Sequence, residues 1–114
     1  MVSYALLGSS ISQTRTVRFD TASNVWRLLG TDADLVVPSG PSALAFQGGT
    51  LVQVLSMDVF APALARRWNG SAWSAFTTLT GVNSIEARAV VHQDTLFLGF
   101  TQGGSAGVAR LNVP

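Results

Sequence analysis

Short runs of mainly apolar residues, separated by polar residues and glycines, make up most of the chain. The apolar positions do not recur at helical spacing. The runs are roughly four to eight residues long, are rich in Val, Leu, Phe and Trp, and end at Gly, Asn, Asp or Ser, as strands separated by turns do. Only the segment 59–67 would permit a helix, and Pro62 argues against one. The pattern predicts strands over 3–7, 15–19, 25–29, 42–46, 51–56, 64–68, 72–77, 88–92, 96–100 and 108–111.

This strand pattern repeats within the chain. The segment 42–52 aligns with 87–97, so small and apolar positions, a polar turn and a Thr-Leu restart recur 45 residues further along. An arginine, a large apolar residue and a turn-forming Asp or Asn occur three times, at 18–20, 67–69 and 110–112. Trp26 and Trp73 follow the first two of these triplets at corresponding positions, and Asn69-Gly70 is a strong signal for a type I′ hairpin turn.

Four short antiparallel strands in a unit of about 45 residues are typical of a β-propeller blade. We therefore predict an all-β fold of about two and a half four-stranded units in one propeller segment, 1–114, divided into a partial blade 1–30, a blade 31–81 and a partial blade 82–114. Because a ring usually needs at least four blades, we expect a cyclic homo-oligomer, a dimer or trimer, to complete it. The predicted strands do not divide into whole four-stranded blades, even when copies of the chain are combined. Either a strand takes a different position in its blade, or the chain is a piece of a longer array.

Composition and charge limit the kinds of partner that we expect for the chain. The chain has 114 residues, 47% of them hydrophobic and 11% charged, which suits one compact domain. Its net charge is only +1 and it has no basic block, so nucleic acid is not an expected partner. It has no cysteine, so neither disulfides nor thiolate chemistry are expected. Pro and Gly residues interrupt its uncharged stretch 35–57, so no membrane insertion is expected. The first ten residues lack the positive region of a signal peptide.

No set of residues suited to catalysis or metal binding emerges. His92 is the only histidine, and its counterpart in the preceding unit is Gln47 at a turn, so we interpret it as a turn residue. Asp32 and Asp34 lack the further ligands of a calcium loop, and the glycines of 103–107 lack the lysine of a phosphate-binding loop. We predict that the protein is not an enzyme and uses no cofactor or metal.

The segment 67–73 carries a family resemblance. It resembles the Arg-Trp-Asn-Gly-Ser-x-Trp segment of bacterial, largely secreted or surface-associated, propeller-like repeat proteins related to kelch and tectonin arrays. More distantly, the chain resembles the fucose-binding propeller lectins, in which a Trp-Asp-Gly-x-x-Trp stretch joins strands of a blade. Those lectins surround the sugar with an arginine, a glutamate and a tryptophan, and no glutamate here matches theirs. The resemblance implies a propeller fold and a secreted or surface location.

Tryptophan beside arginine and asparagine suggests carbohydrate binding, because an aromatic face packs on a pyranose while polar side chains bond its hydroxyls. Packing between blades explains the repeated Trp and Arg positions equally well. Arg66 breaks the repeat, since Val17 and Ala109 are its counterparts, and is either functional or exposed at an edge. The predicted function is a lectin-like binding module, and the alternative is a self-assembling scaffold without a small ligand. The candidate ligand-binding residues are Arg66, Arg67, Trp68, Asn69, Trp73, Trp26 and Arg18.

Overall fold

A computed structural model describes residues 2–7, 12–31, 34, 42–56, 61–83, 85–102 and 105–111. Within these ranges the chain forms β-strands and no α-helix, which confirms the all-β prediction. The segment with the helix-permissive pattern contributes a strand from Pro62 onward. The strands are β1 (Val2–Leu7), β2 (Ser12–Asp20), β3 (Val25–Leu28), β4 (Ser42–Gln47), β5 (Thr50–Leu55), β6 (Pro62–Trp68), β7 (Thr77–Asn83), β8 (Ile85–His92), β9 (Thr95–Gln102) and β10 (Ser105–Leu111).

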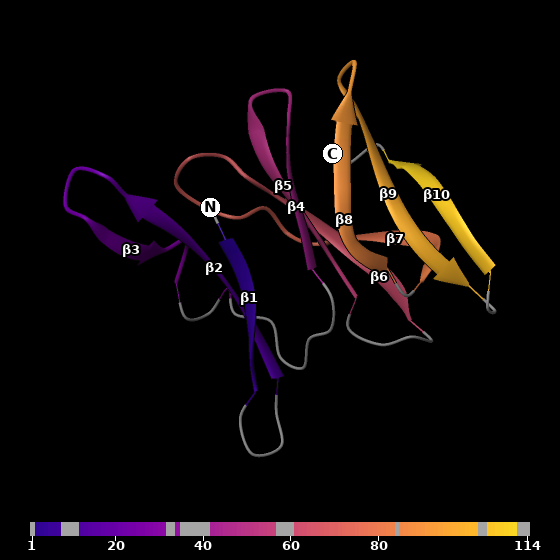
Figure 1. Cartoon of the computed structure of the whole chain (residues 1–114), viewed down its shortest axis with the longest axis horizontal. Coiled ribbons are helices and arrows are strands. Elements are labelled where there is room, and N and C mark those ends of the chain that lie inside the picture. The colour runs from indigo at the N-terminus through magenta and orange to yellow at the C-terminus, as the bar shows by residue number, and fades with distance from the viewer. Residues whose placement is uncertain are drawn as a thin grey trace.

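The strands form three antiparallel sheets in which neighbours in sequence are also neighbours in space. The first sheet has the order β1-β2-β3, the middle sheet β4-β5-β6-β7 and the last sheet β10-β9-β8. The three sheets lie side by side, with the four-stranded sheet between the two three-stranded ones (Figure 1).

The fourth strand of the middle sheet lies later in the chain than predicted. We expected it at 72–77, but β7 covers Thr77–Asn83. After the turn that follows β6, only an isolated bridge forms, between Trp68 and Trp73, and regular pairing resumes at Ala65 and Thr77. Between these two pairs β6 advances three residues and the other strand four, so the extra residue forms a bulge. The side chain of Ser74 contributes to the irregularity, because its Oγ accepts a hydrogen bond from the Arg67 N–H at 2.9 Å.

The Asn69-Gly70 turn is present, but its predicted type is wrong. A type I′ turn needs two consecutive residues with positive φ, and here only Gly70 has one, at 105°. Asn69 instead uses its side chain, whose Oδ1 accepts hydrogen bonds from the N–H groups of Ser71 and Ala72, each at 2.9 Å. Two-residue turns with paired positive φ occur at the tips of two other hairpins, at 48–49 between β4 and β5 and at 93–94 between β8 and β9.

Strand β5 lies at the centre of the core. Every residue of 51–56 is at most 2% exposed, because the middle sheet is covered on both faces. Toward the last sheet, Val52 and Val54 belong to a cluster that includes Leu96 and Leu98 of β9. The alternating residues point the other way, and Gln53 bonds to Thr16 of the first sheet.

A polar turn closes the hairpin of β2 and β3. The Asp20 carboxylate accepts hydrogen bonds from the Ser23 hydroxyl at 2.8 Å and the Ala22 N–H at 3.0 Å, and it pairs with Arg27 Nε at 3.0 Å. These contacts, that of Ser23 first and that of Arg27 second, lower the pKa of Asp20 to about 2 from its ordinary value of 3.8. Since they favour the ionised form, they stabilise the turn above pH 3.8 and are lost as the pH falls through 2.

We expect the Asp20 carboxyl of the folded protein to titrate with a pKa of about 2, measured by NMR. Ser23→Ala should move this pKa upward, because it removes the contact that lowers it most. Asp20→Asn should flatten the loss of stability between pH 3.8 and 2. A midpoint at the ordinary value in the unaltered protein would contradict the arrangement of this turn.

Candidate functional site

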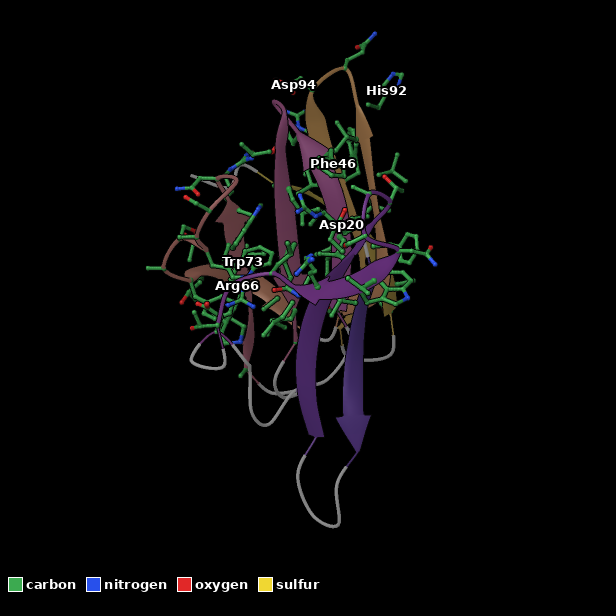
Figure 2. All side chains as sticks on the ribbon, turned by 90° about the vertical axis from the view of Figure 1, so that its left-hand side faces the viewer. Asp20, Phe46, Arg66, Trp73, His92 and Asp94 are labelled. Carbon is green, nitrogen blue, oxygen red and sulfur yellow. The ribbon has the colours of Figure 1, made fainter. Side chains whose placement is uncertain are left out.

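Arg66 of β6 is buried between the first and middle sheets. It is only 4% exposed, so the alternative that it lies exposed at an edge is wrong. Its Nε donates to Gln53 Oε1 at 2.8 Å, and its Nη1 donates to the main-chain carbonyl of Asp34 at 3.0 Å. The guanidinium lies over two aromatic rings, 4.3 Å from the centroid of Trp73 and 4.6 Å from that of Phe76. Figure 2 labels Arg66 and Trp73 side by side. Desolvation lowers the pKa of Arg66 to about 10, and the charge of Asp34 opposes this shift.

The contacts of Arg66 continue into the first sheet. Gln53 Nε2 donates to Thr16 Oγ1 at 2.9 Å and to Ser42 Oγ at 3.3 Å. The Trp73 indole N–H donates to the carbonyl of Leu29 at 3.1 Å. We call Arg66, Gln53, Thr16, Trp73 and Phe76 the Arg66 cluster. It joins two sheets through a buried polar centre, and its arginine is occupied by partners within the chain.

Two aromatic pairs occupy corresponding positions of the first and middle sheets. Phe19 and Trp26 face each other across β2 and β3 with ring centroids 5.2 Å apart. Trp68 and Trp73 do the same in the middle sheet, at 5.4 Å, and both pairs are edge-to-face. They differ in their surroundings, because Trp26 is 56% exposed whereas Trp73 is part of the Arg66 cluster.

Arg67 points to the opposite side of β6 and holds the turn between β4 and β5. Its Nη1 donates to Thr50 Oγ1 at 2.6 Å, and its Nη2 donates to Gln47 Oε1 at 2.6 Å. Gln47 Nε2 in turn donates to the carbonyl of Asp94 at 2.8 Å, and the Gly48 N–H donates to the Asp94 carboxylate at 3.1 Å. We call this group the turn latch, because it connects the hairpin tips of the middle and last sheets. Asp94 and the neighbouring His92 lie at this end of the molecule in Figure 2.

Two open hollows flank the turn latch, and both are lined by Gln47 and Asp94. The first has a volume of about 380 Å³ and is completed by Gly48, Thr50 and Arg67. The second has a volume of about 310 Å³ and is completed by Thr95, Arg110 and Leu111. Arg110 is exposed and makes no hydrogen bond or ion pair with the part of the chain that the structure describes. We call this second space the Arg110 hollow; it combines a free guanidinium with a fixed carboxylate.

The seven predicted residues do not meet in one site. Arg66 and Trp73 belong to the Arg66 cluster, with Trp68 beside them, while Arg67 belongs to the turn latch. Asn69 is exposed in the turn after β6. Arg18 and Trp26 lie on the first sheet, where Arg18 is exposed and pairs in register with Arg27.

The residues that line the Arg110 hollow were not among the predicted site residues. The third copy of the arginine triplet contained a usable signal, because Arg110 repeats Arg67. In the third unit His92 replaces Gln47, the side chain that receives Arg67. No signal in the sequence brings Gln47 and Asp94 together, because they belong to different hairpins.

The sequence features interpreted as non-catalytic lie elsewhere or outside the structure. His92 is exposed at the end of β8, whereas Asp32, Gly103 and Gly104 lie outside the described residues. Over the described ranges, no group of three or more acidic or histidine side chains could hold a metal ion, and no helix has the length and apolar character to cross a membrane. A comparison with protein-family models, curated proteins and solved structures found no match.

Proposed function

We propose that the chain is a β-propeller segment that acts as a non-enzymatic, lectin-like binding module. The stacking of three antiparallel sheets supports the propeller arrangement. So does the packing of β4 against β8, because these are the first strands of two consecutive sheets. The equivalent aromatic pairs of the first and middle sheets add to this support, since each joins a strand to the segment that follows its turn at corresponding repeat positions.

The observation that carries the ligand class is the Arg110 hollow. Arg110 supplies free donors, and Asp94 supplies a carboxylate held in place by the N–H of Gly48. Thr95 adds a hydroxyl, and the wall formed by Leu111 is apolar. A guanidinium and a carboxylate on either side of a hollow suit the neighbouring hydroxyls of a sugar, which both donate and accept hydrogen bonds. The hollow is open, so the affinity of one site is expected to be modest, and avidity in an assembly would raise it.

Screening the protein against a glycan array, followed by calorimetric titration of the best ligand, tests this proposal. Arg110→Ala should weaken binding at least about tenfold, because hydrogen bonds to a charged group contribute about 1.5–3 kcal/mol. Arg18→Ala is the matched control, since Arg18 is the exposed counterpart of Arg110 on the first sheet. Both variants should unfold at the temperature of the unaltered protein.

Two results would contradict the proposal. If the protein binds no glycan, carbohydrate is not its ligand. If Arg110→Ala binds glycan as tightly as the unaltered protein does, the Arg110 hollow is not the binding site. In the first case the self-assembling scaffold becomes the better candidate. The scaffold is favoured by the large apolar side chains that the outer sheets expose, including Trp26 at 56%, Val90 at 63% and Val108 at 73%.

A further inference from the structure

We propose that two copies of this chain associate head to tail, with the outer face of the last sheet of each copy packed on the outer face of the first sheet of the other. The inference rests on the propeller arrangement proposed above and adds the partner and the surfaces. It does not depend on the ligand.

The outer face of the last sheet is mostly apolar, with one charged residue, Arg110, on its edge strand β10 as the register partner of Phe97. Along β9, Leu96 and Leu98 point into the core, so the alternating Phe97 points outward. Val90 is the register partner of Phe97 on β8 and is 63% exposed. Val108 of β10 is 73% exposed, because its neighbour Ala109 packs against the core. Val90, Phe97 and Val108 define the last outer face.

The outer face of the first sheet carries an aromatic pair. Thr16 points to the middle sheet, where it bonds to Gln53, so Val17 and Phe19 lie on the other side of β2. Their register partners on β3 are Leu28 and Trp26. Phe19 is 38% exposed and Trp26 is 56% exposed. Val17, Phe19, Trp26 and Leu28 define the first outer face.

The contact inside the chain indicates what covers these faces. By the sequence repeat, Val90, Phe97 and Val108 correspond to Ala45, Val52 and Ala65. Those three residues lie on the side of the middle sheet that packs on the last sheet.

Phe19 and Trp26 correspond to Trp68 and Trp73, and Trp73 packs on the first sheet through its bond to Leu29. Within the chain, the first sheet packs on the middle sheet and the middle sheet packs on the last sheet. By the repeat, the last outer face is equivalent to the face that a sheet turns toward the next sheet, and the first outer face is equivalent to the face that a sheet turns toward the preceding sheet. A second copy presents the complementary face to each.

The number of sheets favours two copies. Each chain provides three sheets, so two chains bring six together and three chains bring nine. Propellers typically have four to eight blades, which includes six and excludes nine. A head-to-tail contact between different faces closes into a ring when the rotation between sheets allows it, and closure leaves neither apolar face exposed.

Light scattering after size exclusion, over a range of concentrations, tests the inference. The unaltered protein should have twice the chain mass of 12.0 kDa. Val108→Asp damages only the last outer face and Trp26→Asp only the first, and each should raise the dimer dissociation constant on the order of 100-fold by burying a charge. Val25→Asp is the matched control. Val25 precedes Trp26 on the opposite side of β3, is 43% exposed, and should leave the dimer intact.

Mixing the two damaged variants distinguishes a head-to-tail contact from a symmetric one. Each alone should be monomeric, but an equimolar mixture should form a dimer with one copy of each, because it retains one undamaged pair of faces. Circular dichroism should show both variants folded.

A protein that stays monomeric at all concentrations, a mixture that fails to associate, or a variant that still dimerises alone would overturn the inference. Glycan titration of the same samples separates the two proposals. A dimer that binds no glycan refutes only the carbohydrate function, and a glycan-binding monomer refutes only the association.

Discussion

Arg66→Ala is expected to lower the free energy of unfolding by about 2–4 kcal/mol. The truncation removes the hydrogen bonds that Arg66 donates to Gln53 Oε1, on a fully buried side chain, and to the carbonyl of Asp34. It also empties the space against the rings of Trp73 and Phe76. The loss is offset in part because the variant no longer desolvates a charge, a cost that appears in the lowered pKa of Arg66, about 10. A domain is typically stable by about 5–15 kcal/mol, so this one change removes a large share.

Urea denaturation followed by tryptophan fluorescence measures the effect, since Trp73 contacts the substituted side chain. Arg66→Met is the informative companion, because it keeps an unbranched apolar chain in the same space and carries no charge. We expect its loss to be smaller than that of alanine. Losses below about 0.5 kcal/mol for Arg66→Ala, the range of ordinary surface substitutions, would mean that the Arg66 cluster does not join the sheets.

Leu98→Ala is expected to cost about 2–5 kcal/mol, through lost burial and the cavity it leaves. Leu98 of β9 is fully buried and lies in the cluster between the middle and last sheets. Val52 and Val54 of the same cluster are held in the middle of their sheet, so the neighbours have little freedom to close the gap.

Thermal and urea unfolding of this variant should be compared with that of Val25→Ala. Val25 is also an apolar strand residue but is 43% exposed, so its truncation should change stability by no more than about 0.5 kcal/mol. Equal effects of the two substitutions would refute the packing of the middle sheet on the last one.

Much of the fold was predictable because the strands carry their information locally. The short apolar runs at 96–100 and 108–111 predict β9 and β10, because Gly, Asn, Asp or Ser residues bound such runs in the sequence. The fourth strand of the middle sheet was misplaced because Asn69 and Ser74 satisfy backbone groups with their side chains, which delays regular pairing until Thr77. Strand propensity alone does not predict when side chains compete with a neighbouring strand for backbone hydrogen bonds.

The site was less predictable because its parts come from separate repeat units. The break in the repeat singled out Arg66, but its burial depends on Thr16, Gln53 and Trp73, which lie on three different strands or loops. The Arg110 hollow likewise needs two hairpin tips to lie together, and the contact between Gln47 and Asp94 that joins them is tertiary. Pattern analysis finds the repeated arginine without indicating which copy has lost its internal partner.

The burial of β5 on both faces has a consequence for how the chain opens. Within a single chain only the middle sheet has a neighbour on each side, so in the monomer the three sheets form a short linear array with unequal coupling. The outer sheets can separate at the cost of one contact, whereas exposing β5 requires both contacts to break. Its amide protons should therefore exchange with solvent only through global unfolding, while those of β3 and β10 exchange through local fluctuations. The middle sheet is thus the thermodynamic anchor of the protein, and its neighbours are the units that fray.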